Sequence, residues 1–127
     1  MKILIVEDDL LVARYLKSFV ESLGADVVGI TRCVNDSITF IESNQVDGVI
    51  MDLRLADNSN GLDLAKYLAN FKIPFIVTSA NNDCNMLYEL FKTYPIHFIK
   101  KPFSKQDIFV GLTQLEATYN KSRTTIS

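Results

Sequence analysis

The chain has 127 residues, 48% of them hydrophobic, which suits one domain with a substantial core. Its 13 basic and 15 acidic side chains nearly balance, so charge alone gives no reason to expect a nucleic acid or an anionic membrane as partner. The sequence shows neither the pattern of a signal peptide nor a membrane-spanning run, and Cys33 and Cys84 form no metal-binding motif, so we expect a cytoplasmic protein with free thiols.

Five short apolar runs recur along the chain and predict five strands. Their length and continuous apolar character favour strands buried on both faces, as in a parallel sheet. The runs cover residues 3–6, 26–30, 48–51, 74–77 and 97–99.

After each run the apolar residues change to a spacing of three and four, which predicts a helix. The residues with this spacing are Val12, Leu16, Phe19 and Leu23, then Ile38 and Ile41, then Leu64 and Leu68, then Leu87, Leu90 and Tyr94, and finally Ile108, Leu112 and Leu115. Ser104 and Asp107 form a capping box before the last helix. Residues 121–127 are polar and are predicted to be a tail or the start of a linker, which leaves 1–120 as the domain.

Strands that alternate with helices predict a parallel sheet, because each parallel connection needs a crossover. The crossovers place helices on both faces of the sheet. The expected fold class is therefore an α/β sandwich in a single domain.

Charged and polar side chains stand where the predicted strands end. Asp52 ends the third run, Glu7 and Asp8 follow the first, Ser79 follows the fourth and Lys101 follows the fifth. In open α/β sheets, ligands bind in the crevice at the carboxyl ends of the strands. One crevice is therefore expected to collect three carboxylates, a hydroxyl group and an ammonium group.

This set of groups predicts phosphoryl chemistry. Carboxylates that lie close together either raise their pKa values or recruit a cation, and oxygen ligands without His or Cys favour Mg²⁺. A lysine and a hydroxyl group beside that ion would neutralise phosphoryl oxygens. Asp52 is then the expected nucleophile.

In this order and at strand ends, these residues resemble the receiver domain of two-component response regulators, in its chemotaxis-receiver-like form. The resemblance covers nearly the whole chain. It is carried by the acidic pair Glu7-Asp8, the phosphoacceptor-like Asp52, the pair Ser79-Ala80 and the triplet Lys101-Pro102-Phe103. It implies a flavodoxin-like (βα)5 fold with strand order 2-1-3-4-5 and a cis bond between Lys101 and Pro102.

The resemblance also implies a role for each site residue. Asp52 would accept a phosphoryl group from a histidine kinase or phosphotransfer protein in a Mg²⁺-dependent reaction. The metal ligands would be Asp8, Asp52 and the backbone carbonyl of Arg54, with Glu7 acting through water. Ser79 and Lys101 would hold the phosphoryl oxygens, and Phe98 would be the aromatic switch residue.

The implied output is a change in the surface formed by the fourth helix, fifth strand and fifth helix. That surface would control an unknown output domain or protein, and phosphorylation could produce a homodimer. No direct binding of nucleic acid is expected, and the only catalysis would be self-phosphorylation and dephosphorylation. Phe98 replaces the more frequent Tyr, and Thr93-Tyr94-Pro95 stands where many receivers have Gly-Ala.

Two other functions are compatible with the same residues. One is a Mg²⁺-dependent aspartyl phosphatase of haloacid-dehalogenase type, although those enzymes have Asp-x-Asp after the first strand. The other is a pseudo-receiver that binds a partner without phosphorylation. Asp9 is interpreted as a helix N-cap, and His97 as a packed or surface side chain.

Overall fold

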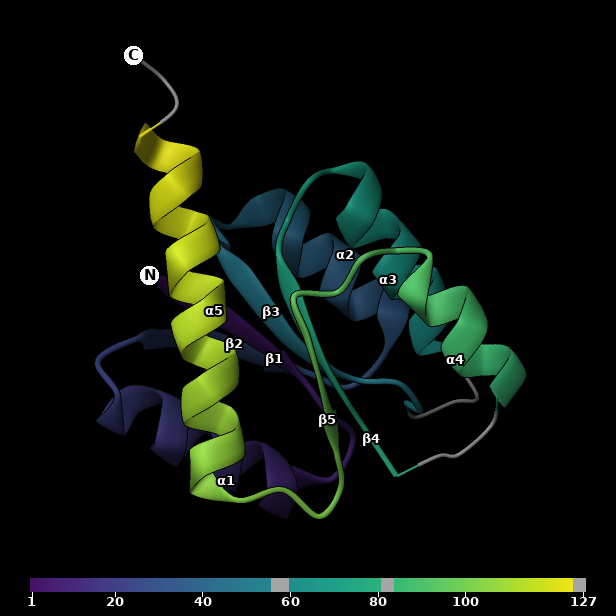
Figure 1. Ribbon diagram of the computed structural model, residues 1–127, viewed down its shortest axis with the longest axis horizontal. Coiled ribbons are helices and arrows are strands. Elements are labelled where there is room, and N and C mark those ends of the chain that lie inside the picture. The colour runs from purple at the N-terminus through teal and green to yellow at the C-terminus, as the bar shows by residue number, and fades with distance from the viewer. Residues whose placement is uncertain (56–59, 81–83, 125–127) are drawn as a thin grey trace.

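The computed structural model describes residues 1–55, 60–80 and 84–124, in which strands and helices alternate (Figure 1). The strands are β1 (Lys2–Val6), β2 (Asp26–Thr31), β3 (Gly48–Asp52), β4 (Phe75–Ser79) and β5 (His97–Lys100). The helices are α1 (Leu10–Ser22), α2 (Val34–Ser43), α3 (Gly61–Asn70), α4 (Cys84–Phe91) and α5 (Lys105–Thr124). Each predicted apolar run thus lies largely within a strand, and a helix follows each strand.

The strands form one parallel sheet in the order β2-β1-β3-β4-β5. Helices α1 and α5 cover one face, and α2, α3 and α4 cover the other (Figure 1). The α/β sandwich predicted from the alternation and the strand order implied by the resemblance are both confirmed. The chain reverses its direction of travel across the sheet between β1 and β3, which opens a crevice where these two strands end.

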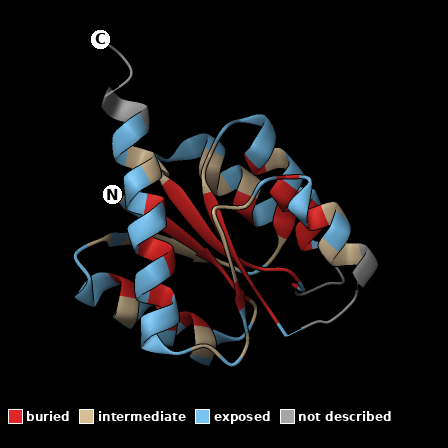
Figure 2. Ribbon diagram, viewed as in Figure 1, coloured by how far each residue is buried: buried red, intermediate tan, exposed pale blue. Residues whose placement is uncertain are grey.

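The central strands are buried on both faces because their side chains alternate between two cores. In β1, Leu4 packs into the core against α2–α4, whereas Ile3 and Ile5 pack against α1 and α5. Figure 2 shows the sheet as the buried layer between the two helical layers. This burial fixes the register of β1 and β3, and with it the position of the residues that follow them.

Two predicted caps are present. Asp9 accepts hydrogen bonds from the backbone N–H groups of Leu11 at 3.0 Å and Val12 at 3.4 Å. In the capping box, the Ser104 N–H donates to Asp107 at 2.8 Å, and the Asp107 N–H donates to Ser104 at 3.2 Å. These bonds satisfy amides that the first helical turn leaves without a partner. The bond between Lys101 and Pro102 is cis, as the resemblance implied.

Two residues that the sequence predicts on buried helix faces are exposed in the structure. Leu23 is the C-cap of α1 and is 39% exposed, because Gly24 follows with φ of +93° and ends the helix. Tyr94 lies beyond the end of α4 with φ of +56° and is 85% exposed. Apolar spacing continued past both helix ends, so it gave no sign of the turn.

The last helix is longer than the sequence predicted. Helix α5 continues to Thr124, so its final turn lies in the segment interpreted as a polar tail. The boundary between domain and tail at residue 120 stays a prediction. No helix in the described part of the chain is long and apolar enough to cross a membrane.

Candidate functional site

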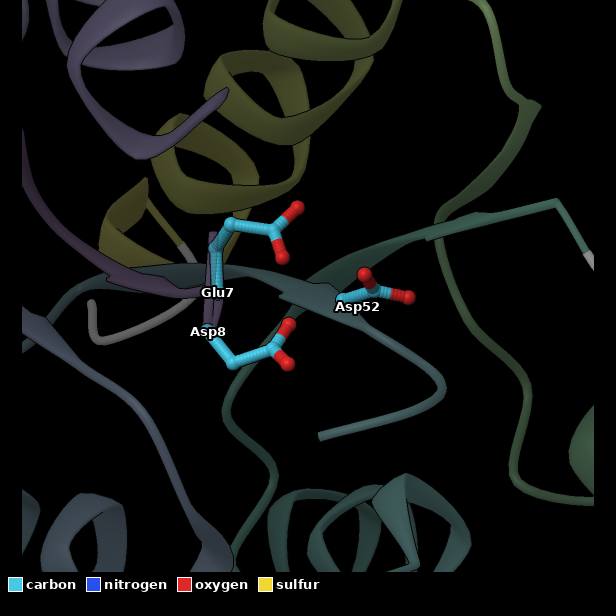
Figure 3. Close-up of side chains that lie close together, drawn as sticks. All are labelled: Glu7, Asp8 and Asp52. Atoms are coloured by element: carbon cyan, nitrogen blue, oxygen red, sulfur yellow. The ribbon is translucent and has the colours of Figure 1, made fainter. Parts of the chain in front are cut away.

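The ends of β1 and β3 bring three carboxylates together, here called the acidic cluster (Figure 3). Glu7, Asp8 and Asp52 each offer one oxygen, and these oxygens all lie within 4.8 Å of one another. Glu7 and Asp8 follow β1, and Asp52 is the last residue of β3. Adjacent parallel strands end at the same edge of a sheet, so residues distant in sequence meet there.

The ammonium group of Lys101 binds two members of the acidic cluster. Its Nζ donates to Glu7 Oε1 and to Asp52 Oδ2, each at 2.7 Å. Strand alternation explains the convergence. Ile5 and Ile50 both face α1 and α5, and the side chains two residues further along, Glu7 and Asp52, point to the same side. Sequence reasoning placed Lys101 near Asp52 but missed its contact with Glu7.

Burial makes the charges at this site strongly dependent on one another. Glu7 is 1% exposed and Asp52 is 8% exposed. Burial raises the pKa of Glu7 to about 7, against the opposing effect of its hydrogen bond with Lys101. Burial alone would lower the pKa of Lys101, but its hydrogen bonds to Asp52 and Glu7 outweigh that effect and raise it. One ammonium group faces three carboxyl groups, so the site favours a further cation.

The backbone beyond Asp52 turns back over the end of β3. The N–H of Arg54 donates to Asp52 Oδ1 at 3.2 Å, which places the Arg54 backbone beside this carboxylate. The N–H of Gly61 donates to the carbonyl of Leu53 at 2.9 Å. A Cβ at Gly61 would lie 2.5 Å from that carbonyl oxygen, so only glycine fits at the start of α3. Sequence reasoning did not identify this close approach.

Ser79 lies at the same sheet edge. Asp52 pairs with Thr78 in the sheet, so Ser79 stands one position beyond the pair. Ser79 is 1% exposed, and its backbone carbonyl accepts a hydrogen bond from the N–H of Lys101 at 2.9 Å. The structure therefore brings the predicted hydroxyl-bearing residue to the edge where Asp52 and Lys101 meet.

The predicted switch residue Phe98 lies on β5 and is partly buried. Its ring packs against Phe91, the last residue of α4, with ring centroids 5.8 Å apart and an interplanar angle of 61°. Sequence reasoning missed Phe91, because helical spacing gives no information about contacts with another element. His97 is partly buried under α5, where a Cβ at Gly111 would approach its ring to 3.3 Å.

An apolar groove of about 530 Å³ opens beside Lys101. Leu11, Val12 and Tyr15 of α1 form one side, and Pro102 and Phe103 form the other. Leu11 is 78% exposed and forms part of this apolar surface. The groove is an apolar surface next to Lys101, which binds two members of the acidic cluster.

Comparison with known proteins places the chain among signalling regulators. A sequence model of the response regulator receiver domain matches residues 3–113. The phyllosphere-induced regulator PhyR of Methylorubrum extorquens is 32% identical over 115 residues, which cover 89% of this chain and 42% of PhyR. The sensory transduction protein LytT of Bacillus anthracis is 28% identical, over 85% of this chain and 44% of LytT. The chain thus spans less than half the length of these relatives.

Solved structures agree with this fold. The response regulatory domain of MrkE from Klebsiella pneumoniae superposes with a TM-score of 0.86 at 24% identity, over 95% of this chain and 99% of that domain. A CheY-like receiver domain protein from Methanospirillum hungatei gives a TM-score of 0.86 at 19% identity, over 95% of this chain and 97% of that one. At these identities the similarity establishes the fold alone.

Proposed function

The chain belongs to the response regulator receiver domain family, and on this basis we propose that it is the phosphoacceptor of a two-component phosphorelay, phosphorylated on Asp52. The observation that carries the proposal is the contact between Lys101 Nζ and Asp52 Oδ2 at 2.7 Å, beside two more carboxylates within 4.8 Å. An oxygen nucleophile held against an ammonium group and a candidate cation site is well placed to take up a phosphoryl group, since both charges neutralise its oxygens.

In the proposed reaction, an Asp52 oxygen attacks the phosphorus atom of a phosphohistidine on the partner. The O–P bond forms as the P–N bond breaks, and the electron pair of that bond leaves with the imidazole nitrogen. Lys101 and Ser79 then hold the negatively charged phosphoryl oxygens, Lys101 through an ionic hydrogen bond and Ser79 through a charge-assisted hydrogen bond from its hydroxyl group. The chain catalyses its own phosphorylation and dephosphorylation and turns over no separate substrate.

Asp8, Asp52 and the backbone carbonyl of Arg54 would hold Mg²⁺ in this proposal, with Glu7 acting through a bound water. Oxygen donors within 4.8 Å of one another and an excess of negative charge suit this hard cation. When bound, it supplies positive charge to the phosphoryl oxygens.

The proposed phosphodonor is a histidine kinase or a phosphotransfer protein that approaches along the apolar groove beside Lys101. The proposed output is a change in the surface of α4, β5 and α5, transmitted by Ser79 and Phe98. That surface would act on an output domain, a separate protein or a second copy of the chain, without direct contact to nucleic acid. A cytoplasmic location stays a prediction from the sequence.

The proposal is tested by incubating the protein with Mg²⁺ and acetyl phosphate and measuring the intact mass. The wild type should gain one phosphoryl group, and Asp52→Asn should gain none. Asp36→Asn, which changes an exposed acid in the first turn of α2, should be labelled like the wild type. Labelling that persists in Asp52→Asn would refute the assignment of the phosphoacceptor.

The same preparation separates the two alternatives from the proposal. An aspartyl phosphatase would turn over a phosphate monoester many times per protein molecule, whereas the proposed phosphoacceptor should not. A pseudo-receiver would not bind beryllofluoride, a phosphoryl mimic, in the presence of Mg²⁺. The proposed phosphoacceptor should bind it at Asp52.

A further inference from the structure

Helix α4 packs on the fold with part of its described apolar surface left exposed. Among the α4 side chains that the structure describes, Leu90 is fully buried, whereas Tyr88 and Phe91 are 65% and 51% exposed. Met86 and Leu87 are partly buried and pack against the core on that side of the sheet. Each remaining contact between α4 and the sheet therefore contributes a large share to fixing the position of the helix.

One of these contacts joins α4 to β5. The Phe91 ring, at the end of α4, meets the Phe98 ring in an edge-on arrangement with centroids 5.8 Å apart. Phe98 itself packs on the core between the sheet and α2–α4. A rotation of the Phe98 side chain would therefore break or reshape its contact with α4.

The pleat of the sheet connects Phe98 to the proposed phosphorylation site. Val77 of β4 pairs with Phe98 of β5, so both side chains point to the same face. Ser79 stands two residues beyond Val77 and projects to that face as well. Ser79 and Phe98 thus project to one face of the sheet, and on that face Phe98 contacts Phe91 at the end of α4.

We propose that Phe91 is a positioning residue that couples α4 to the rotamer of Phe98 and stabilises the unphosphorylated orientation of the helix. This inference rests on the proposed function, because it takes the phosphoryl group on Asp52 as the signal. As Ser79 is drawn toward the phosphoryl oxygens, the Phe98 ring turns inward and leaves Phe91. The end of α4 loses that contact, and the helix moves to the orientation that it adopts in the phosphorylated state.

Thermodynamic linkage makes this coupling measurable at the phosphorylation site. A contact present only in the unphosphorylated state opposes the binding of a phosphoryl mimic to Asp52. Phe91→Leu should therefore bind beryllofluoride about two- to tenfold more tightly than the wild type, which is the factor that one aromatic pair contributes. The backbone amide shifts of Met86 and Leu90 in the unliganded variant should move toward their positions in the liganded wild type.

Two variants serve as matched controls in the presence of Mg²⁺. Phe91→Tyr keeps the ring and should bind beryllofluoride with wild-type affinity. Tyr88→Leu removes a more exposed ring from the same helix, one that contacts Lys92, and should also leave the affinity unchanged. In the Phe98→Leu background, Phe91→Leu should have no further effect, because its partner ring is gone.

Each outcome decides the inference. Wild-type affinity together with unchanged α4 shifts in Phe91→Leu would overturn the coupling and leave the proposed function intact. A gain in affinity that persists in the Phe98→Leu background would also overturn it, since Phe91 would then act by another route. If the wild type fails to bind beryllofluoride, the proposed function fails and this inference fails with it.

Discussion

Glu7 should make stability depend on pH in a way that a single substitution removes. Glu7 is 1% exposed, and burial raises its pKa from the ordinary 4.5 to about 7. The folded protein therefore binds this proton more tightly than the unfolded chain does. The resulting stability is complete below pH 4.5 and is lost as the pH rises through 7, in total about 3 kcal/mol at 1.36 kcal/mol per pKa unit.

Urea unfolding at pH 5 and pH 8, followed by circular dichroism with a chelator present, measures this loss. Most of the effect, about 2 to 3 kcal/mol, falls between these two pH values. The free energy of unfolding of the wild type should fall by that much more than the free energy of unfolding of Glu7→Gln, which keeps an acceptor for Lys101 but does not titrate. Glu21→Gln, on the exposed face of α1, should follow the wild type. Equal falls in the wild type and Glu7→Gln would show that Glu7 does not titrate in this range.

Three further substitutions test other parts of the structure. Gly61→Ala should lower the free energy of unfolding, measured with urea, by about 2 kcal/mol, because its Cβ would lie 2.5 Å from the Leu53 carbonyl oxygen. Gly24→Ala should lower it by about 1 kcal/mol, because the added Cβ would lie in open space but the φ angle of +93° is unfavourable for alanine. Tyr94→Gly should raise the free energy of unfolding by about 1 kcal/mol because φ is +56°, and a loss of stability would contradict that reason. Leu11→Asp should slow phosphotransfer from the partner kinase about tenfold or more but leave labelling by acetyl phosphate unchanged. Equal slowing with both donors would contradict the proposal that the kinase docks in the groove beside Lys101.

The positions of the site residues could be predicted because they depend on the backbone. Asp52 and Glu7 follow buried strands, and parallel strands end at one edge of the sheet. Once the apolar runs were read as strands, the crevice followed from topology without any knowledge of side-chain contacts. The same logic could have paired Lys101 with Glu7, since alternation along β1 and β3 places both acids on the side of α1 and α5.

The helix ends and contacts between helices and strands could not be predicted in this way. Leu23 and Tyr94 continue the apolar spacing of their helices, although the backbone has already turned away. The Phe91–Phe98 contact depends on where α4 lies along the sheet, and no local sequence pattern specifies that position. Gly61 was missed for a similar reason, because its close neighbour is a carbonyl in the preceding loop.

Strand β3, which carries Asp52, is more deeply buried than helix α4, which is proposed to respond to phosphorylation. Every residue of β3 is buried, so a displacement of Asp52 would disturb two cores at once. In α4, Leu90 is fully buried, but the ring of Phe91 is half exposed. Turning one phenylalanine ring into the core contributes about 2 kcal/mol, which is small against the packing of a buried strand but comparable to the contacts that hold a short helix. A phosphoryl group on Asp52 should therefore reposition α4 and leave the sheet that carries the acidic cluster in place.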